Sequence, residues 1–187
     1  MARAKSPEKR QAILTAAIRV IAAQGLEAPT AKIAKEAGIA EGSLFTYFET
    51  KDVLLNQLYL ELKRELNHGL RTGFPSDARL KDRARHIWDQ YLDWAASSPE
   101  KRKVLTMLKV SDRVTEASRS IESDGMESLK IAMAEIGERG AFAAAPGLPT
   151  TVLTALVDAT AEKMTGKAKL NQTYRDAGFD VFWRATK

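Results

Sequence analysis

Small polar side chains gather on one face of a short predicted helix. A helical wheel places Gly42, Ser43 and Thr46 on this face and the apolar Leu44 and Phe48 on the opposite one. Glycine, serine and threonine are weak helix formers, so helix stability does not explain this face. Small side chains let a helix approach base edges in a DNA major groove, which is about 12 Å wide. Two short helices around a glycine turn also occur in other helical proteins, so the spacing alone leaves both interpretations open.

Residues for enzymatic or metal chemistry are scarce in the sequence. Cysteine is absent, which excludes disulfides, thiolate zinc sites, iron–sulfur clusters and cysteine nucleophiles. The two histidines, His68 and His86, belong to no metal-binding or catalytic motif. The sequence contains no glycine-rich phosphate loop, no HExxH motif and no nucleophile elbow. We therefore expect a protein that is not an enzyme and that holds no metal and no cofactor.

Two preceding helices must position the small polar face. The first begins at Pro7, which suits the first helical position, and ends at Gly25. The second is predicted from Thr30 to Ala37, and Gly38 supplies the turn before the third helix at about 41–48. Two short helices joined by a glycine turn are the ingredients of a helix-turn-helix.

The remainder of the chain is also predicted to be helical. Residues 69–77 are expected to form a loop, and the alanine-, glycine- and proline-rich residues 140–149 a linker. Helices are expected after a capping Thr50, at about 80–96, after Pro99, at 112–137, from Thr150 or Thr151 to Met164, and at about 171–185. The predicted fold class is all-α, with about nine helices and no internal repeat.

The composition is that of a globular chain with a basic balance. Its 187 residues carry a formal net charge of +5, which favours association with a polyanion. No stretch approaches the roughly 18 consecutive apolar residues of a membrane span, and the N-terminus lacks the apolar region of a signal peptide. We therefore expect a cytoplasmic protein without a membrane partner.

A longer pattern covers residues 10–58. Its most specific part is the run 37–54, with Ala37-Gly38-Ile39, Gly42-Ser43-Leu44-Phe45, Tyr47-Phe48 and Lys51-Asp52-Val53-Leu54. This pattern resembles the N-terminal domain of the TetR family of transcriptional regulators. The resemblance implies a three-helix DNA-binding head with a helix-turn-helix over residues 1–57. It also implies a helical domain over residues 58–187 that binds a small effector and dimerises.

The resemblance assigns DNA contacts to residues of the head. Tyr47 and Lys51 would hold phosphates on either side of the groove without reading sequence. Thr30 would cap the second helix and offer its hydroxyl to a phosphate, and Phe45 would press on a thymine methyl. The implied DNA-binding set is Thr30, Gly42, Ser43, Phe45, Thr46, Tyr47 and Lys51.

Two positions, Ala40 and Phe45, depart from the usual family pattern, and Glu41 is unusual because of its charge. Ala40 stands where a capping serine or threonine is usual, which removes a cap worth about 1 kcal/mol. Phe45 stands where tyrosine is usual, so one hydroxyl is missing. Glu41 suits a helix N-terminus but would face phosphates, so it either filters sequence or turns away.

The resemblance also implies an effector site and a dimer interface beyond the head. Aromatic and methionine residues are the candidates for an apolar effector pocket, although such residues are more often plain core. These candidates are Trp88, Tyr91, Trp94, Met107, Met126 and Met133. Apolar residues of the last two helices suit a dimer interface or packing within one subunit. They are Val152, Leu153, Leu156, Val157, Met164, Phe179 and Phe182.

The sequence therefore predicts a homodimeric repressor that binds a double-stranded, palindromic DNA operator. A small-molecule effector would release it from that operator. The alternative is a helical ligand-binding or interaction protein that no longer reads a specific DNA site, which Ala40, Glu41 and Phe45 favour.

Overall fold

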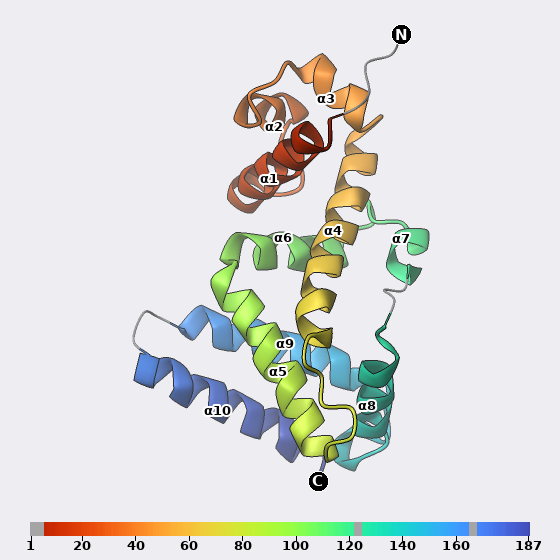
Figure 1. Ribbon diagram of the computed structural model, residues 1–187, viewed down its shortest axis with the longest axis vertical. Coiled ribbons are helices and arrows are strands. Elements are labelled where there is room, and N and C mark those ends of the chain that lie inside the picture. The colour runs from red at the N-terminus through yellow and green to blue at the C-terminus, as the bar shows by residue number, and fades with distance from the viewer. Residues whose placement is uncertain (1–5, 122–124, 165–167) are drawn as a thin grey trace. The chain divides into compact units, whose positions relative to one another are not determined.

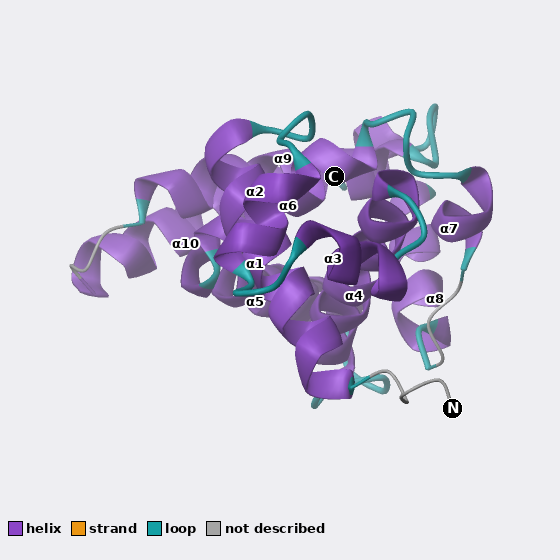
Figure 2. Cartoon of the chain, turned by 90° about the horizontal axis from the view of Figure 1, so that it is seen from above, coloured by secondary structure: helices purple, strands orange, loops and turns teal. Residues whose placement is uncertain are grey.

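Every regular element in the described part of the chain is a helix (Figure 2). The computed structural model describes residues 6–121, 125–164 and 168–187. The chain divides into two compact units, one formed by residues 1–64 and 99–121 and the other by residues 65–98 and 122–187. The all-α prediction is confirmed, with ten α-helices in the described residues where about nine were expected.

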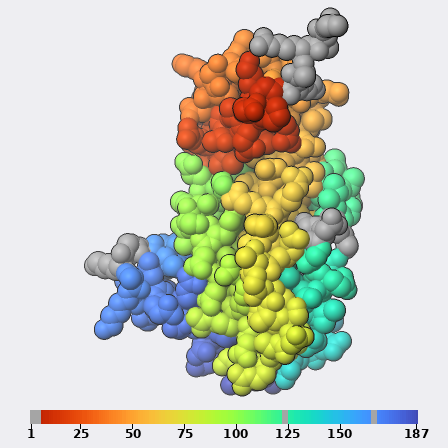
Figure 3. Space-filling model, viewed as in Figure 1, coloured from red at the N-terminus to blue at the C-terminus, as the bar shows by residue number. Residues whose placement is uncertain are grey.

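The first unit is built around the three N-terminal helices. Within it, α1 packs against α2 and α6, and α2 packs against α3 (Figure 1). In the space-filling view the red atoms of α1 lie directly against the orange atoms of the helices that follow it (Figure 3). Its helices are α1 (Pro7–Gln24), α2 (Thr30–Glu36), α3 (Glu41–Tyr47), the first part of α4 (Lys51–Arg71), α6 (Pro99–Lys109) and α7 (Glu116–Ser120).

Local signals explain where the helices of the first unit begin and end. Ser6 caps α1, because its hydroxyl accepts a hydrogen bond from the amide of Lys9 at 3.2 Å. Gly25 ends α1 with a φ of 81°, a backbone conformation that favours glycine. Thr50 begins α4 in the same way as Ser6 begins α1, by accepting from the amide of Val53 at 3.1 Å.

In the second unit, α5 is the central helix and packs against α8, α9 and α10. Its core contains Trp88, whose indole N–H donates to the backbone oxygen of Arg175 at 3.0 Å and whose ring lies 6.3 Å from that of Phe179. The helices are the end of α4, α5 (Leu80–Ser97), α8 (Glu127–Gly137), the 3-10 helix η1 (Gly140–Phe142), α9 (Leu148–Lys163) and α10 (Ala168–Arg184).

Several predicted boundaries are wrong in the second half of the chain. The expected helix 112–137 is two helices, α7 and α8, and residues 122–124 between them lie outside the described part. The expected linker 140–149 contains η1, whose Phe142 is buried against Phe182 at a ring distance of 5.8 Å. Pro149 does not mark a loop, because α9 begins at Leu148 and places this proline in its first turn, where no amide is needed.

Smaller differences concern helix ends on either side of the predicted loops. α4 continues to Arg71, so the loop expected from residue 69 begins three residues later, at Thr72. α10 begins at Ala168, three residues earlier than expected. Residues 165–167, which precede it, lie outside the described part of the chain.

Candidate nucleic-acid interface

The third helix presents a polar face to solvent and buries the opposite one. Leu44 is completely buried and Phe48 is nearly so, whereas Gly42, Ser43 and Thr46 are exposed. The apolar pair therefore fixes the orientation of α3 on the first unit. Thr46 is partly engaged within the helix, since its hydroxyl donates to the backbone oxygen of Gly42 at 3.3 Å.

Gly42 has no packing role among the described residues. A Cβ atom added at this position would meet no atom of the described residues within 4 Å. The side chain of Phe45, on the flank of the same face, is 40% exposed, which is unusual for a large apolar residue. The outer surface of α3 is thus small, open and partly apolar.

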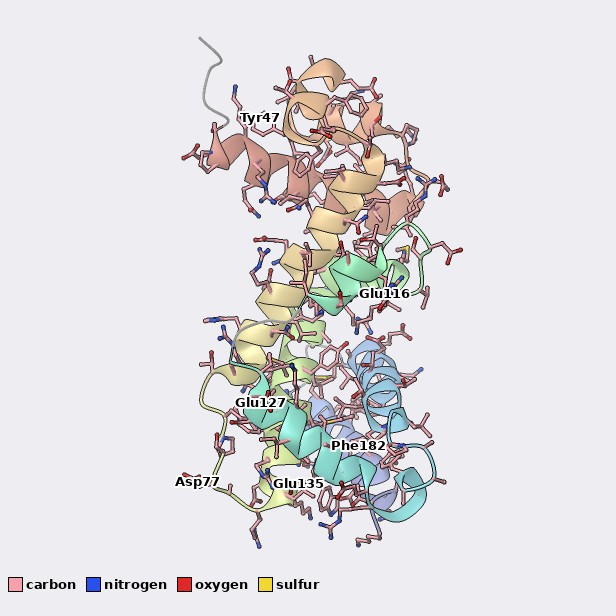
Figure 4. The ribbon with its side chains drawn as sticks, turned by 90° about the vertical axis from the view of Figure 1, so that its right-hand side faces the viewer. Tyr47, Asp77, Glu116, Glu127, Glu135 and Phe182 are labelled. Atoms are coloured by element: carbon pink, nitrogen blue, oxygen red, sulfur yellow. The ribbon has the colours of Figure 1, made fainter. Side chains whose placement is uncertain are left out.

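Tyr47 is held at the junction of α1 and α3. Its hydroxyl oxygen accepts a hydrogen bond from the amide of Ser6 at 3.2 Å, so its own proton remains available for a further acceptor (Figure 4). Arg10 of α1 supports the same junction, because its guanidinium lies 5.7 Å from the centre of the Phe48 ring and donates to Gln57 at 2.9 Å. These contacts fix the phenol at the surface of the first unit.

Thr30 does not cap α2, contrary to the prediction. Pro29 occupies the N-cap position, and Thr30 is the first residue of the helix itself. The Thr30 hydroxyl instead donates to a carboxylate oxygen of Glu41 at 2.6 Å, which joins the start of α2 to the start of α3. In this structure the hydroxyl predicted to bind a phosphate is therefore engaged by Glu41. Ala40 is the N-cap residue of α3 and, as expected, supplies no side-chain cap.

Lys51 lies at the start of α4 with its side chain mostly buried. Its ammonium is 4.0 Å from a carboxylate oxygen of Glu27, at the outer limit for an ion pair. The same glutamate is paired with Arg113, a residue that no pattern in the sequence indicates. Arg113 lies far from the helix-turn-helix along the chain and belongs to no local motif, so only the folded arrangement reveals it.

The candidate effector residues fall in both units. Trp88, Tyr91 and Trp94 lie on α5, Met126 precedes α8 and Met133 lies on it, all in the second unit. Trp88 and Tyr91 are buried, and the half-exposed Trp94 donates from its indole to Glu65 at 3.0 Å.

Met107 belongs instead to α6 of the first unit. A groove of about 760 Å³ lies elsewhere in that unit, along α1 from Pro7 to Arg19 and beside Glu36 of α2 and its C-cap residue Ala37. None of the candidate effector residues lines this groove.

Four of the predicted dimer-interface residues are core residues of the single chain. Leu153, Val157, Phe179 and Phe182 are between 0% and 4% exposed, so they are already covered without a second subunit. The prediction for these four is therefore corrected in favour of packing within one subunit. The other three, Val152, Leu156 and Met164, are half-exposed.

Other apolar residues of the last two helices face outward. Leu148 of α9 is 43% exposed, and Leu170 and Val181 of α10 are 39% and 59% exposed. Leu170 and Val181 are separated by eleven residues, or about three turns, and therefore lie on one side of α10. An outward apolar side of this kind favours contact with another surface.

The described residues offer neither a metal site nor a membrane span. No group of three or more histidine, cysteine, aspartate or glutamate side chains in the described ranges is arranged to hold a metal ion. Among the same residues, no helix combines the length and apolar character needed to cross a bilayer.

Comparison with known proteins places the head among regulators. Residues 13–58 match the family model described as bacterial regulatory proteins, tetR family. The nucleoid occlusion factor SlmA of Haemophilus influenzae (strain PittGG) is 30% identical over 101 residues, which cover 53% of this chain and 46% of that factor. The fatty acid metabolism regulator protein of Bacillus subtilis (strain 168) is 41% identical over 58 residues, which cover 30% of this chain and 29% of that protein. The chain thus matches half or less of the length of these curated relatives.

A solved structure extends the similarity over the whole fold. The tetR family transcription regulator from Shewanella sp. PV-4 is 27% identical and superimposes with a TM-score of 0.76. The alignment covers 95% of this chain and 97% of that one. The family model and this solved structure both carry the description of a tetR family regulator.

Proposed function

Because the chain belongs to the tetR family of bacterial regulatory proteins, we propose that it regulates transcription by binding a specific DNA operator. In this proposal α3 enters the major groove. Residues 1–57 supply the DNA-binding head, and residues 58–187 supply effector binding and dimerisation. The DNA contacts come from Gly42, Ser43, Phe45 and Thr46 toward the bases, with Thr30, Tyr47 and Lys51 toward the backbone.

The observation that carries this proposal is the glycine on the exposed face of α3. Glycine inside a helix costs about 1 kcal/mol relative to alanine. At Gly42 the cost has no internal compensation, since an added Cβ would meet nothing within 4 Å in the described residues. Because Gly42 shares its exposed face with Ser43 and Thr46, close approach of the helix backbone to a partner is the physical reason that we infer for glycine at this position.

The first experiment selects bound duplexes from a random pool with the purified chain. A palindromic product is expected, because two copies of one short helix read two half-sites about 34–36 Å apart, or a multiple of that spacing. Equal binding to all duplexes at low salt would contradict the proposal and favour a helical interaction protein.

Two glycine variants then test the placement of α3. Gly42→Ala should weaken operator binding about fivefold or more, because it separates the helix from base edges. Gly69→Ala is the matched control, since this glycine also lies in a helix with open space around it, yet in α4 and outside the proposed contact face.

Replacing both Tyr47 and Lys51 by alanine should weaken binding to all sequences alike. Unchanged operator affinity in Gly42→Ala and in the double variant would refute this placement.

We also infer a homodimer in which the outward apolar sides of α9 and α10 meet their counterparts. The residues concerned are Leu148, Val152, Leu156, Leu170 and Val181, because they are apolar and not covered within the chain. Val181→Glu should convert the dimer to a monomer in sedimentation experiments, since the charge would be buried at the interface. Val110→Glu, at a valine that is 82% exposed in the first unit, should leave the dimer intact. A dimeric Val181→Glu variant would contradict this interface.

The proposed effector is a small apolar or aromatic molecule bound in the second unit. The proposal rests on Trp88, Tyr91, Trp94, Met126 and Met133, which bring aromatic and thioether side chains together in the sequence of that unit. Such a molecule releases DNA only if it binds the DNA-incompetent state more tightly. A screen that follows tryptophan fluorescence and operator release together tests this part. Ligands that quench fluorescence without changing operator affinity would contradict effector-controlled repression.

A further inference from the structure

One arginine joins three segments of the first unit at the start of α4. Arg113, in the segment between α6 and α7, donates from Nη1 to Oδ1 of Asp52 and from Nη2 to Oε2 of Glu27, both at 2.9 Å. Asp52 lies in the first turn of α4, and Glu27 lies between α1 and α2. The hydrogen bond that Arg113 donates to Asp52 and the negative charge of Glu27 raise the pKa of Arg113 above its already high value.

The backbone around Arg113 is held by α4. The side-chain amide of Asn56 donates to the backbone oxygen of Arg113 at 2.8 Å, and its oxygen accepts from the amide of Thr115 at 2.9 Å. Thr115 in turn caps α7 by accepting from the amide of Ser118 at 3.2 Å. The guanidinium is therefore placed by a network of hydrogen bonds and does not depend on its ion pairs alone.

Two cations share a single carboxylate oxygen in this cluster. Oε2 of Glu27 is 2.9 Å from Nη2 of Arg113 and 4.0 Å from Nζ of Lys51. Only the arginine is within hydrogen-bonding distance. Lys51, Arg113, Glu27 and Asp52 together carry no net charge, whereas removal of Arg113 would leave a net charge of −1. The Lys51 ammonium, which already lies beside Glu27, could then take the place of the Arg113 guanidinium on that carboxylate.

We propose that Arg113 is a positioning residue for DNA binding, which engages Glu27 and Asp52 and so leaves Lys51 available to a DNA phosphate. This inference rests on the proposed function, because it assigns to Arg113 an effect on the phosphate contact of Lys51. Without Arg113, Lys51 pairs with Glu27 and that phosphate contact is lost. The loss is independent of base sequence, since phosphates carry no sequence information.

The test measures binding of Arg113→Gln to the selected operator and to an unrelated duplex over a range of salt concentrations. The slope of log affinity against log salt should fall by about 0.9 for each bound subunit. The deficit relative to the unmodified chain should therefore be about 3.5-fold larger per subunit at 50 mM than at 200 mM salt. Arg79→Gln is the matched control, because it removes one cation that pairs with Asp82 in the second unit, and its slope should be unchanged.

Second-site variants separate this role from a purely structural one. In the Arg113→Gln background, Glu27→Gln should restore the salt slope, because Lys51 no longer has a competing carboxylate there. If Arg113 only held segments of the fold together, removal of Glu27 in addition to Arg113 would not restore the salt slope. In a Lys51→Ala background, Arg113→Gln should leave the slope unchanged. The inference would be overturned if Glu27→Gln did not restore the salt slope of Arg113→Gln. It would also be overturned if Arg113→Gln lowered the slope equally in the Lys51→Ala background.

A further variant keeps the inference testable if Arg113→Gln does not fold. Glu27→Gln alone should bind the operator at least as tightly as the unmodified chain, whereas a structural clamp predicts weaker binding. Failure of the unmodified chain to prefer any duplex would instead refute the proposed function. If the unmodified chain prefers an operator but Glu27→Gln binds it more weakly, the role proposed for Arg113 is refuted and the proposed function is not.

Discussion

Gly178 lies inside α10 at a point where the helix contacts α5 and α9. An added Cβ would lie 2.6 Å from Cζ2 of Trp88 and 2.7 Å from Oγ1 of Thr160. Two effects therefore oppose each other in Gly178→Ala. Alanine improves helix propensity by about 1 kcal/mol, whereas forcing a methyl group into a packed core typically costs about 1–3 kcal/mol.

The surroundings of Gly178 decide which effect is larger. Trp88 is completely buried, and its indole is bonded to the backbone oxygen of Arg175 at 3.0 Å, so the ring cannot swing aside without losing that bond. Thr160 closes the other side of the site. We therefore place the packing cost near the upper end of its range and expect Gly178→Ala to lower the free energy of unfolding by about 1–2 kcal/mol.

Urea unfolding followed by far-ultraviolet circular dichroism measures this difference. All variants must be compared at one protein concentration, because dimerisation would make stability depend on it. Gly69→Ala is again the control, since this helical glycine has no described atom within 4 Å of an added Cβ and should gain up to about 1 kcal/mol. If Gly178→Ala were as stable as Gly69→Ala, the close packing of α10 against Trp88 would be refuted.

Two further predictions concern a helix cap and an ion pair. Ala40→Ser should stabilise the chain by about 1 kcal/mol, because the N-cap of α3 has extended backbone angles and no side-chain acceptor; an unchanged urea midpoint would contradict this. Arg83, which donates to both carboxylate oxygens of Glu135, holds the pKa of that carboxyl below its usual 4.5 (Figure 4). A lowered pKa stabilises the fold above pH 4.5, and this stabilisation disappears as the pH falls through the folded-state value. Glu135→Gln should therefore be less stable than the unmodified chain at pH 7, with the difference shrinking below pH 4; a constant difference would refute this ion-pair effect.

The parts of the fold that the sequence predicted depend on local chemistry. The start and end of α1 follow from Pro7 and Gly25, and the outward face of α3 follows from the spacing of Leu44 and Phe48. In each case the deciding contacts lie within one helix or at its ends, so a few neighbouring residues contain the information.

The parts that could not be predicted depend on which segments meet. Arg113 reaches Glu27 and Asp52 across 86 and 61 residues of chain, and no local pattern indicates such a pairing. The helical spacing of Leu153 and Val157 likewise predicts a buried apolar face. It does not indicate whether the surface that covers this face belongs to the same chain or to a second copy. The sequence could not predict that Met107 lies in a different unit from the other candidate effector residues, because apolar character does not reveal to which unit a side chain belongs.

The two faces of the third helix have different roles: the inward face stabilises the fold, and the outward face is the one proposed to contact DNA. α3 has only seven residues and no side-chain cap, and helices shorter than about 12–15 residues are marginal by themselves. Burial of Leu44 and of the C-cap residue Phe48 must therefore hold it in place, since these are the buried side chains of this segment. The outward residues contribute little to that burial, so they can be exchanged at small cost to folding. Substitutions such as Gly42→Ala should consequently change DNA affinity while leaving the unfolding midpoint equal or higher, and a large loss of stability there would show that the outward face also supports the fold.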